Sequence, residues 1–234
     1  MKIFQRLIQE IKNLIYGVFV YLKSIPTSVK NDVPYVCQFA NPESVELSLS
    51  KKLNTLDDPD WKNTGASSPK RYAEWAFTMC GMASALMALK FFKKDPLLEV
   101  AELAEEALSN GVYEQEPTEI SSMKYKPFSH WINGYGLKAN IYTRLSIRGI
   151  QYALSKESLV IISVNPNIRG YNTAPENQKG GHLVLVTGYD LKQGTMSINN
   201  PSGFVSCNTQ INHTLPFKDF LAYYAGRGIV VSVK

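Results

Sequence analysis

Residues 180–201, GGHLVLVTGYDLKQGTMSINNP, give the clearest indication of the fold. An apolar run at 182–189 is followed by the turn-forming segment Asp-Leu-Lys-Gln-Gly, and a second, shorter run occupies 196–199. Two such runs separated by a few turn residues are typical of an antiparallel hairpin. Because paired strands lie side by side, we expect His182, at the start of the first run, to lie near Asn200, at the end of the second.

Further strands are expected around this hairpin, and helices are expected before it. Apolar, β-branched runs at 159–164 and 228–233 predict two more strands. Helical spacing of apolar residues predicts helices at 1–24, 78–92, from Asp95-Pro96 to about 110, at 129–135, 146–156 and 217–225. Helices first and strands later predict an α+β fold, in which a helical N-terminal part packs on an antiparallel sheet.

Length and composition agree with one soluble domain and an appendage. The chain has 234 residues, 44% of them apolar, and a formal net charge of +5. Its Lys and Arg are spread along the sequence without a run of five, which argues against nucleic-acid binding. The three cysteines, Cys37, Cys80 and Cys207, allow either one disulfide between Cys37 and Cys207 or three free thiols. No zinc-ligand spacing is present, and we expect no metal and no cofactor.

The N-terminal segment is amphipathic. Apolar residues recur every three or four positions through residues 1–24, with charged residues between them. The stretch is too short for a transmembrane helix, and Ser24-Ile25-Pro26 is a poor signal-peptide cleavage site. We therefore expect a helix at 1–25, docked on its own domain, lying on a membrane surface through residues 1–22, or acting as a signal or anchor. A polar linker at 26–33 and a domain at 33–234 would follow, in a cytoplasmic or membrane-associated rather than a secreted protein.

Cys80 is the candidate nucleophile. With Thr78 as N-cap of the 78–92 helix, Cys80 falls in the first turn, where the helix dipole lowers a thiol pKa. Gly81 would leave room for a substrate next to the sulfur. A buried structural cysteine is the alternative interpretation.

His182 is the candidate base, because it opens a strand directly after two glycines. His130 and His213 lie in a short helix and a polar loop, where surface or capping roles are expected. Asn200 is the candidate that orients the His182 ring, with Asn199 as the alternative, since strand alternation lets only one of the two face the site. The backbone N–H of Cys80 and the side chain of Gln38 are candidate oxyanion donors.

Together these residues resemble a known family. VPYVCQ at 33–38, CGMASALMAL at 80–89, GGHLVLVTGYD at 180–190 and INNPSG at 198–203 resemble the C39-like peptidases, which have a papain-like fold. The resemblance covers residues 33–234 and implies Cys80 as nucleophile, His182 as general base, Asn200 as orienting residue and Gln38 as oxyanion donor. It implies a free-standing domain rather than one fused to an exporter, because no run reaches about 20 apolar residues.

Three features depart from that family pattern. Met82 stands where the family usually has Pro, and Asn200 stands where Asp is more frequent. The segment between Gln38 and Cys80 is longer than the family leads us to expect. Within it, polar residues 40–74 predict a long loop with a short helix near Val45, able to act as a lid or binding element.

The expected activity is thiol-dependent acyl transfer, most simply cleavage of a peptide or amide bond through a thioester. Arg169, Tyr171 and Trp75 are candidates for contact with the substrate, because they lie in or near the loops 165–180 and 40–74. Two alternatives remain open. One is a catalytically inactive papain-like binding module, and the other is a cell-wall amidase of the Cys–His type.

Overall fold

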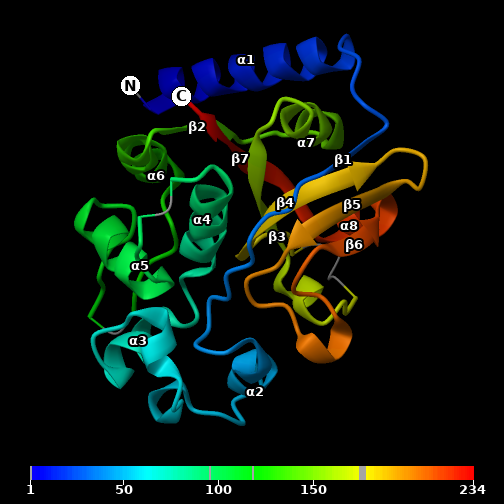
Figure 1. Ribbon diagram of the computed structural model, residues 1–234. Coiled ribbons are helices and arrows are strands. Elements are labelled where there is room, and N and C mark those ends of the chain that lie inside the picture. The colour runs from blue at the N-terminus through cyan, green and yellow to red at the C-terminus, as the bar shows by residue number, and fades with distance from the viewer. Residues whose placement is uncertain (1, 95, 118, 174–177) are drawn as a thin grey trace.

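The computed structural model describes residues 2–94, 96–117, 119–173 and 178–234, and it is an α+β fold (Figure 1). A layer of helices packs against an antiparallel sheet, as predicted. The helices are α1 (Lys2–Tyr21), α2 (Val45–Leu49), α3 (Pro69–Trp75), α4 (Cys80–Phe91), α5 (Val100–Ser109), α6 (Tyr125–Trp131), α7 (Ile147–Leu154) and α8 (Phe217–Tyr223). The strands are β1 (Ser28–Lys30), β2 (Leu137–Tyr142), β3 (Leu159–Val164), β4 (His182–Asp190), β5 (Thr195–Asn199), β6 (His213–Pro216) and β7 (Tyr224–Val233).

The sheet has the strand order β2-β7-β3-β4-β5-β6, with β1 paired to β4. The predicted β4–β5 hairpin is present, and Leu185 lies opposite Asn199 in its register. Every residue of β3 is buried, and so is every residue of β4 up to its last. This burial explains why both strands read as continuous apolar runs instead of alternating ones.

The central helix α4 packs against β3 and β4. Its residues 81–89 are all buried, which accounts for a sequence made almost entirely of Ala, Leu and Met. The helix begins at Cys80 instead of residue 78, and Met79, not Thr78, is its N-cap. Cys80 is therefore the first residue of the helix, one position closer to the N-terminal end of the helix than expected.

Several element boundaries differ from the prediction. Helix α5 begins after Glu99, because Glu99 and Glu102 form a capping box; of the predicted Asp95-Pro96 start, Asp95 lies outside the described residues. The short strands β1, β2 and β6 were not predicted, and β1 lies within the segment expected to be a linker. With three and four residues, β1 and β6 are too short to show a strand pattern in the sequence.

Residues 40–74 form a packed part of the domain, contrary to the expected lid. The segment contains α2, three 3₁₀ turns and α3. The Tyr72 hydroxyl donates a hydrogen bond to Asp58 over 3.2 Å and accepts one from the Ala40 N–H over 3.1 Å, and all three residues are buried. Such buried hydrogen bonds hold the segment in one conformation.

Helix α1 lies along one edge of the molecule, next to β2 and α7 (Figure 1). Polar side chains attach it to the domain. Asn13 donates a hydrogen bond to Thr143 Oγ1 over 2.6 Å, and the Tyr16 hydroxyl donates one to the Gly149 carbonyl over 3.0 Å. Within the described ranges, no helix has the length and hydropathy that crossing a membrane requires.

Candidate active site

The site lies where the start of α4 meets the start of β4. Cys80 is the first residue of α4, its side chain is partly exposed, and the backbone N–H of Leu183 points to its sulfur. Leu183 directly follows His182, and Cys80 and His182 line the same cavity. The α4–β4 packing therefore brings together two residues about a hundred positions apart.

His182 and Asn200 form the second part of the site. His182 Nε2 and Asn200 Oδ1 are 2.8 Å apart, and both side chains are buried. The Ser202 N–H also donates to Asn200 Oδ1, over 3.2 Å. Asn199 points elsewhere: its amide donates to the Val33 carbonyl over 3.1 Å. Of the two alternatives, the hairpin register thus brings Asn200 to the imidazole.

Gln38 lies at the edge of the same cluster. Its backbone N–H donates to the Pro201 carbonyl over 2.9 Å, and its Nε2 donates to the Ala76 carbonyl over 2.8 Å. The side chain is fully buried, and Oε1 has no hydrogen-bond partner in the structure. An amide nitrogen carries two hydrogens, so Gln38 retains one N–H for a further acceptor.

Arg169 adds a charge that sequence analysis did not place here. Its Nε donates to Ser202 Oγ over 2.8 Å, and its Nη2 lies 3.4 Å from His182 Nδ1. From its position in a polar loop of the sequence, Arg169 is only a candidate for contact with the substrate. No local pattern around Arg169 indicates its neighbours, since the loop reaches the site through tertiary packing alone.

Burial sets the protonation states of the site. Burial raises the pKa of the Cys80 thiol, an effect that the Leu183 amide and the Arg169 charge oppose without reversing. Burial, with the Arg169 charge, lowers the pKa of His182 well below its usual value. The expected thiolate of low pKa is therefore wrong for this state. The cavity is lined by a neutral thiol and a neutral imidazole.

A cavity of about 500 Å³ opens beside Cys80 and His182. Its other lining residues include apolar and polar side chains, among them Phe77, Met123, Tyr125, Ser163 and Arg227. Gly181 forms part of the wall with φ of 102°, a backbone conformation that L side chains rarely adopt. The cavity is large enough for a few residues of an extended peptide or for a comparable small ligand.

Two sequence interpretations around the cavity change, and one stays a prediction. Trp75 is fully buried and its indole N–H donates to Glu105, so it belongs to the core and not to a substrate surface. Tyr171 is exposed, with its hydroxyl bonded to Asp219, and its contact with a substrate stays a prediction. A Cβ at Gly81 would lie 2.6 Å from the sulfur of Met123, so this glycine permits close packing and does not make room for a substrate.

The other two cysteines, Cys37 and Cys207, do not line the cavity at Cys80. All three thiols are free, so the alternative with a Cys37–Cys207 disulfide does not occur in this structure. Burial raises the pKa of Cys37 to about 11, while Cys207 is exposed. Among the residues that the structure describes, no group of His, Cys, Asp or Glu side chains is arranged to hold a metal ion.

The raised thiol pKa predicts how Cys80 will react with alkylating agents. In a Cys37→Ala/Cys207→Ala protein, iodoacetamide should modify Cys80 slowly at pH 7, with the rate rising roughly tenfold per pH unit up to pH 9 as the thiolate forms. Mass spectrometry after timed quenching measures this rate, and the urea-unfolded protein supplies the profile of an unperturbed thiol. A fast rate that is constant from about pH 5 to 8 would instead indicate a preformed thiolate–imidazolium pair.

Comparison with known proteins gives one family and several similar folds. The model of the Peptidase_C39 like family matches residues 30–230. A protein from Bacillus anthracis described as a C39-like peptidase has 17% identity and a TM-score of 0.52, covering 88% of this chain and 98% of that one. A double glycine motif protease from an AMS/PCAT transporter, in complex with its leader peptide, has 18% identity and a TM-score of 0.43, covering 68% and 86%.

A third structure that the comparison found is a digestive procathepsin. Procathepsin L 3 of the Tenebrio molitor larval midgut has 13% identity and a TM-score of 0.38, covering 89% of this chain and 70% of that chain. No curated protein matches. At these identities the likeness of the Bacillus anthracis structure concerns the fold alone.

Proposed function

Because this chain belongs to the Peptidase_C39 like family, whose model matches residues 30–230, we propose that it is a cysteine peptidase that cleaves a peptide or amide bond. One observation carries the proposal: the Cys80 thiol at the start of α4 lies against the residue that follows His182, and Asn200 holds the His182 ring at 2.8 Å. Nucleophile, base and orienting group are the parts that thiol-dependent acyl transfer requires.

The hydrogen bond to Asn200 decides which ring nitrogen acts as the base. Asn200 Oδ1 accepts, so His182 Nε2 carries the hydrogen and Nδ1 keeps its lone pair. In the proposed reaction, Cys80 Sγ attacks the substrate carbonyl carbon while its proton passes to His182 Nδ1. His182 then gives that proton to the leaving amine, the C–N bond breaks, and a thioester remains. Water, deprotonated by the same nitrogen, hydrolyses the thioester and restores the thiol.

Oxyanion stabilisation would come from the Cys80 N–H and the free N–H of Gln38. The Gln38 amide is held by the Ala76 carbonyl, which precedes the turn into α4, and a preorganised donor of this kind needs no reorganisation during the reaction.

Arg169 has two opposing effects. Its charge stabilises negative charge on the Cys80 sulfur, and it disfavours a charged His182 ring. Because a charged ring is disfavoured, His182 gives its proton more readily to the leaving amine.

One observation favours a non-catalytic binding module instead. The Arg169 guanidinium lies 3.4 Å from His182 Nδ1, the nitrogen that has to accept the thiol proton. If Arg169 stays there when a peptide binds, Nδ1 cannot serve as base. Catalysis therefore requires Arg169 to move away from His182 Nδ1 when a substrate binds. Measurements of peptidase activity distinguish the enzyme from the binding module.

A peptide-library digestion tests the proposal directly. The wild-type protein, Cys80→Ala and Cys207→Ala would each be incubated with a mixed peptide library, and new termini would be identified by mass spectrometry. We expect the same cleavages from wild type and Cys207→Ala, because Cys207 is an exposed thiol outside the site, and none from Cys80→Ala. Cleavage that survives in Cys80→Ala would contradict the proposal, and binding without cleavage in all three would favour the binding module.

A further inference from the structure

Helix α1 faces the domain with a side that mixes polar and apolar residues, and it faces solvent with its broad apolar side. Asn13 and Val20 are buried against the domain, and Gln9 donates to the Ile141 carbonyl over 3.0 Å. The residues on the opposite side have side chains between 38% and 81% exposed: Phe4, Leu7, Ile8, Ile11, Leu14, Ile15, Val18, Phe19 and Leu22. This is the reverse of a normal surface helix, which buries its apolar stripe.

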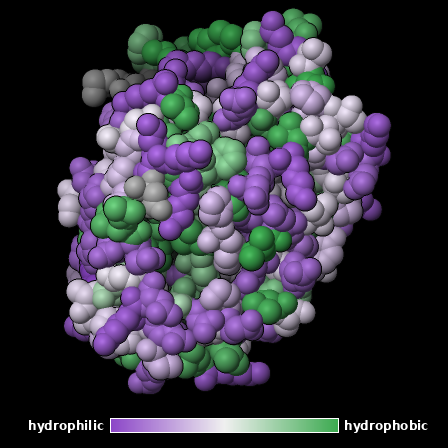
Figure 2. Space-filling model, in the orientation of Figure 1, coloured by the Kyte–Doolittle hydropathy of each residue, from purple (hydrophilic) through white to green (hydrophobic). Residues whose placement is uncertain are grey.

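The apolar face is broad and continuous. At 3.6 residues per turn, its members span roughly 140° of the helix circumference and almost the whole length of the helix, about 30 Å. Figure 2 shows hydrophobic side chains along the upper edge of the molecule, where α1 lies in Figure 1. A patch of this extent is unusual on a monomer and indicates a surface that something covers.

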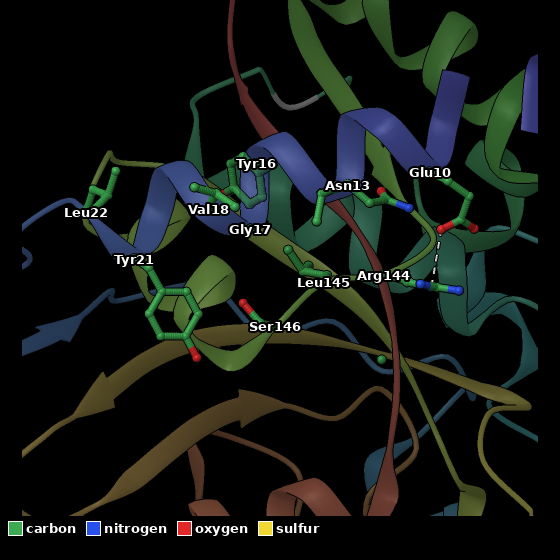
Figure 3. Close-up of a pocket in the computed structure, with 12 residues that line it drawn as sticks. Glu10, Asn13, Tyr16, Gly17, Val18, Tyr21, Leu22, Arg144, Leu145 and Ser146 are labelled. Atoms are coloured by element: carbon green, nitrogen blue, oxygen red, sulfur yellow. Dashed lines mark ion pairs between the residues drawn. The ribbon is translucent and has the colours of Figure 1, made fainter. Parts of the chain in front are cut away.

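A groove beside α1 extends this apolar surface toward the domain. It has a volume of about 740 Å³ and lies between α1 and residues 144–146. Leu14, Val18 and Tyr21 line it from the helix and Leu145 from the domain, and the Tyr21 ring points toward Ser146 (Figure 3). The apolar face of the helix and the apolar wall of the groove therefore form one surface.

The charges around this surface are mainly positive. Lys12 follows Ile11 on the helix, Lys23 Nζ lies 4.8 Å from the centre of the Phe19 ring, and Glu10 is the one acidic residue in the sequence from 7 to 23. Glu10 is paired with Arg144 of the domain over 3.3 Å. Arg148 of α7 adds another cation, bonded to the Val20 and Lys23 carbonyls at the end of the helix. An apolar stripe bordered by cations complements a surface with an anionic exterior and an apolar interior.

We propose that the outward face of α1 docks the protein on an anionic lipid bilayer, with the helix lying in the plane of the interface. The apolar side chains would enter the boundary of the acyl chains, and Lys12 and Lys23 would lie among the headgroups. The width of the face argues against a second copy as occupant, because a two-helix seam needs only two apolar positions in seven. None of the residues lining the groove beside α1 lines the cavity at Cys80, so docking leaves that cavity accessible.

Vesicle flotation with the full-length chain tests this inference. Vesicles of phosphatidylcholine alone would be compared with vesicles that also contain about 30% phosphatidylglycerol. At low salt we expect at least about tenfold stronger partitioning onto the anionic vesicles, and a decline of that preference at high salt. Ile11→Ser/Leu14→Ser/Val18→Ser should lower partitioning about a hundredfold, because three apolar side chains no longer enter the acyl boundary.

A matched control keeps the number of substitutions constant. Leu56, Ile211 and Leu221 are similarly exposed but lie on other elements, so their triple serine variant should bind vesicles like wild type. Lys12→Glu/Lys23→Glu should lose the anionic preference. Equal binding by both triple variants would overturn the inference. A second outcome would also overturn it: light scattering shows that the wild-type protein is a dimer, it does not bind vesicles, and the α1 triple variant is a monomer.

Discussion

Replacing His182 by alanine is expected to lower kcat/KM for peptide hydrolysis by about 10³- to 10⁴-fold, while Cys80 stays in place. The thiol in this site is neutral because burial raises its pKa, so it depends on His182 to remove its proton during attack. Without the imidazole, the only nucleophile at neutral pH is the small thiolate fraction of a thiol with a raised pKa. Steady-state kinetics on the best peptide from the library would measure the loss.

The combination of variants shows whether the two residues act as one unit. Cys80→Ala/His182→Ala should be no less active than the more severe single variant, since both substitutions interrupt the same step. His130→Ala is the matched control, because His130 is exposed on α6 and should leave the rate unchanged. A loss of less than tenfold in His182→Ala would contradict its role as the base.

The pH profile gives an independent check on the same residue. The pKa of His182 lies well below its usual value, so the imidazole stays neutral as the pH falls through 6. The decline of kcat/KM of the wild-type protein on the acid side should therefore be centred at a pH well below 6.5.

Folding stability should depend on pH differently. The unfolded chain protonates this histidine near its ordinary pKa of about 6.5, so stability should already decline as the pH drops below that value.

Replacing Gly203 by alanine is expected to destabilise the fold by about 3 kcal/mol or more, the largest stability effect that we expect from a single methyl group here. A Cβ at this position would lie 2.3 Å from the Thr209 carbonyl oxygen and 2.5 Å from its carbon. These are backbone atoms, so the loop itself has to move. The Gln210 carbonyl accepts from the Asn200 N–H over 2.7 Å, so the same movement reaches the residue that holds His182.

Chemical denaturation of Gly203→Ala beside Gly134→Ala measures this effect. Gly134 has no heavy atom within 4 Å of the position that a Cβ would occupy, and its φ is not in the left-handed region. Its substitution should change the free energy of unfolding by less than about 1 kcal/mol. We also expect Gly203→Ala to lose activity beyond its loss of folded protein. If both variants unfold at the same denaturant concentration, the packing explanation for Gly203 is wrong.

A thiol of raised pKa and a nearby arginine make this site one that substrate binding has to complete. The guanidinium of Arg169 lies at the base nitrogen of His182, and the free amide hydrogen of Gln38 awaits an acceptor. A bound carbonyl would supply that acceptor. The raised pKa of the thiol would slow its oxidation when no substrate is present, since oxidation follows thiolate character.

Much of the fold and site could be predicted from local pattern. The β4–β5 hairpin, the apolar α4 and the order of helices before strands follow from residue spacing, because side chains repeat every two positions in a strand and about every 3.6 in a helix. The spacing also placed Cys80 at a helix start and His182 at a strand start. Both positions depend on the residues next to them in the chain. The short strands β1, β2 and β6 lack that local information and exist because a neighbouring strand pairs with them.

Only the tertiary structure decided the properties of the site that depend on distant neighbours. The hairpin register selects Asn200 over Asn199, and packing of the 165–173 segment brings Arg169 to the imidazole. Burial overrides the expected effect of the helix start on the Cys80 pKa, because the free energy of transferring a charge out of water exceeds the gain from one helix end. The amphipathic pattern of α1 was visible in the sequence. Its orientation, apolar side outward, follows from hydrogen bonds to residues more than a hundred positions away.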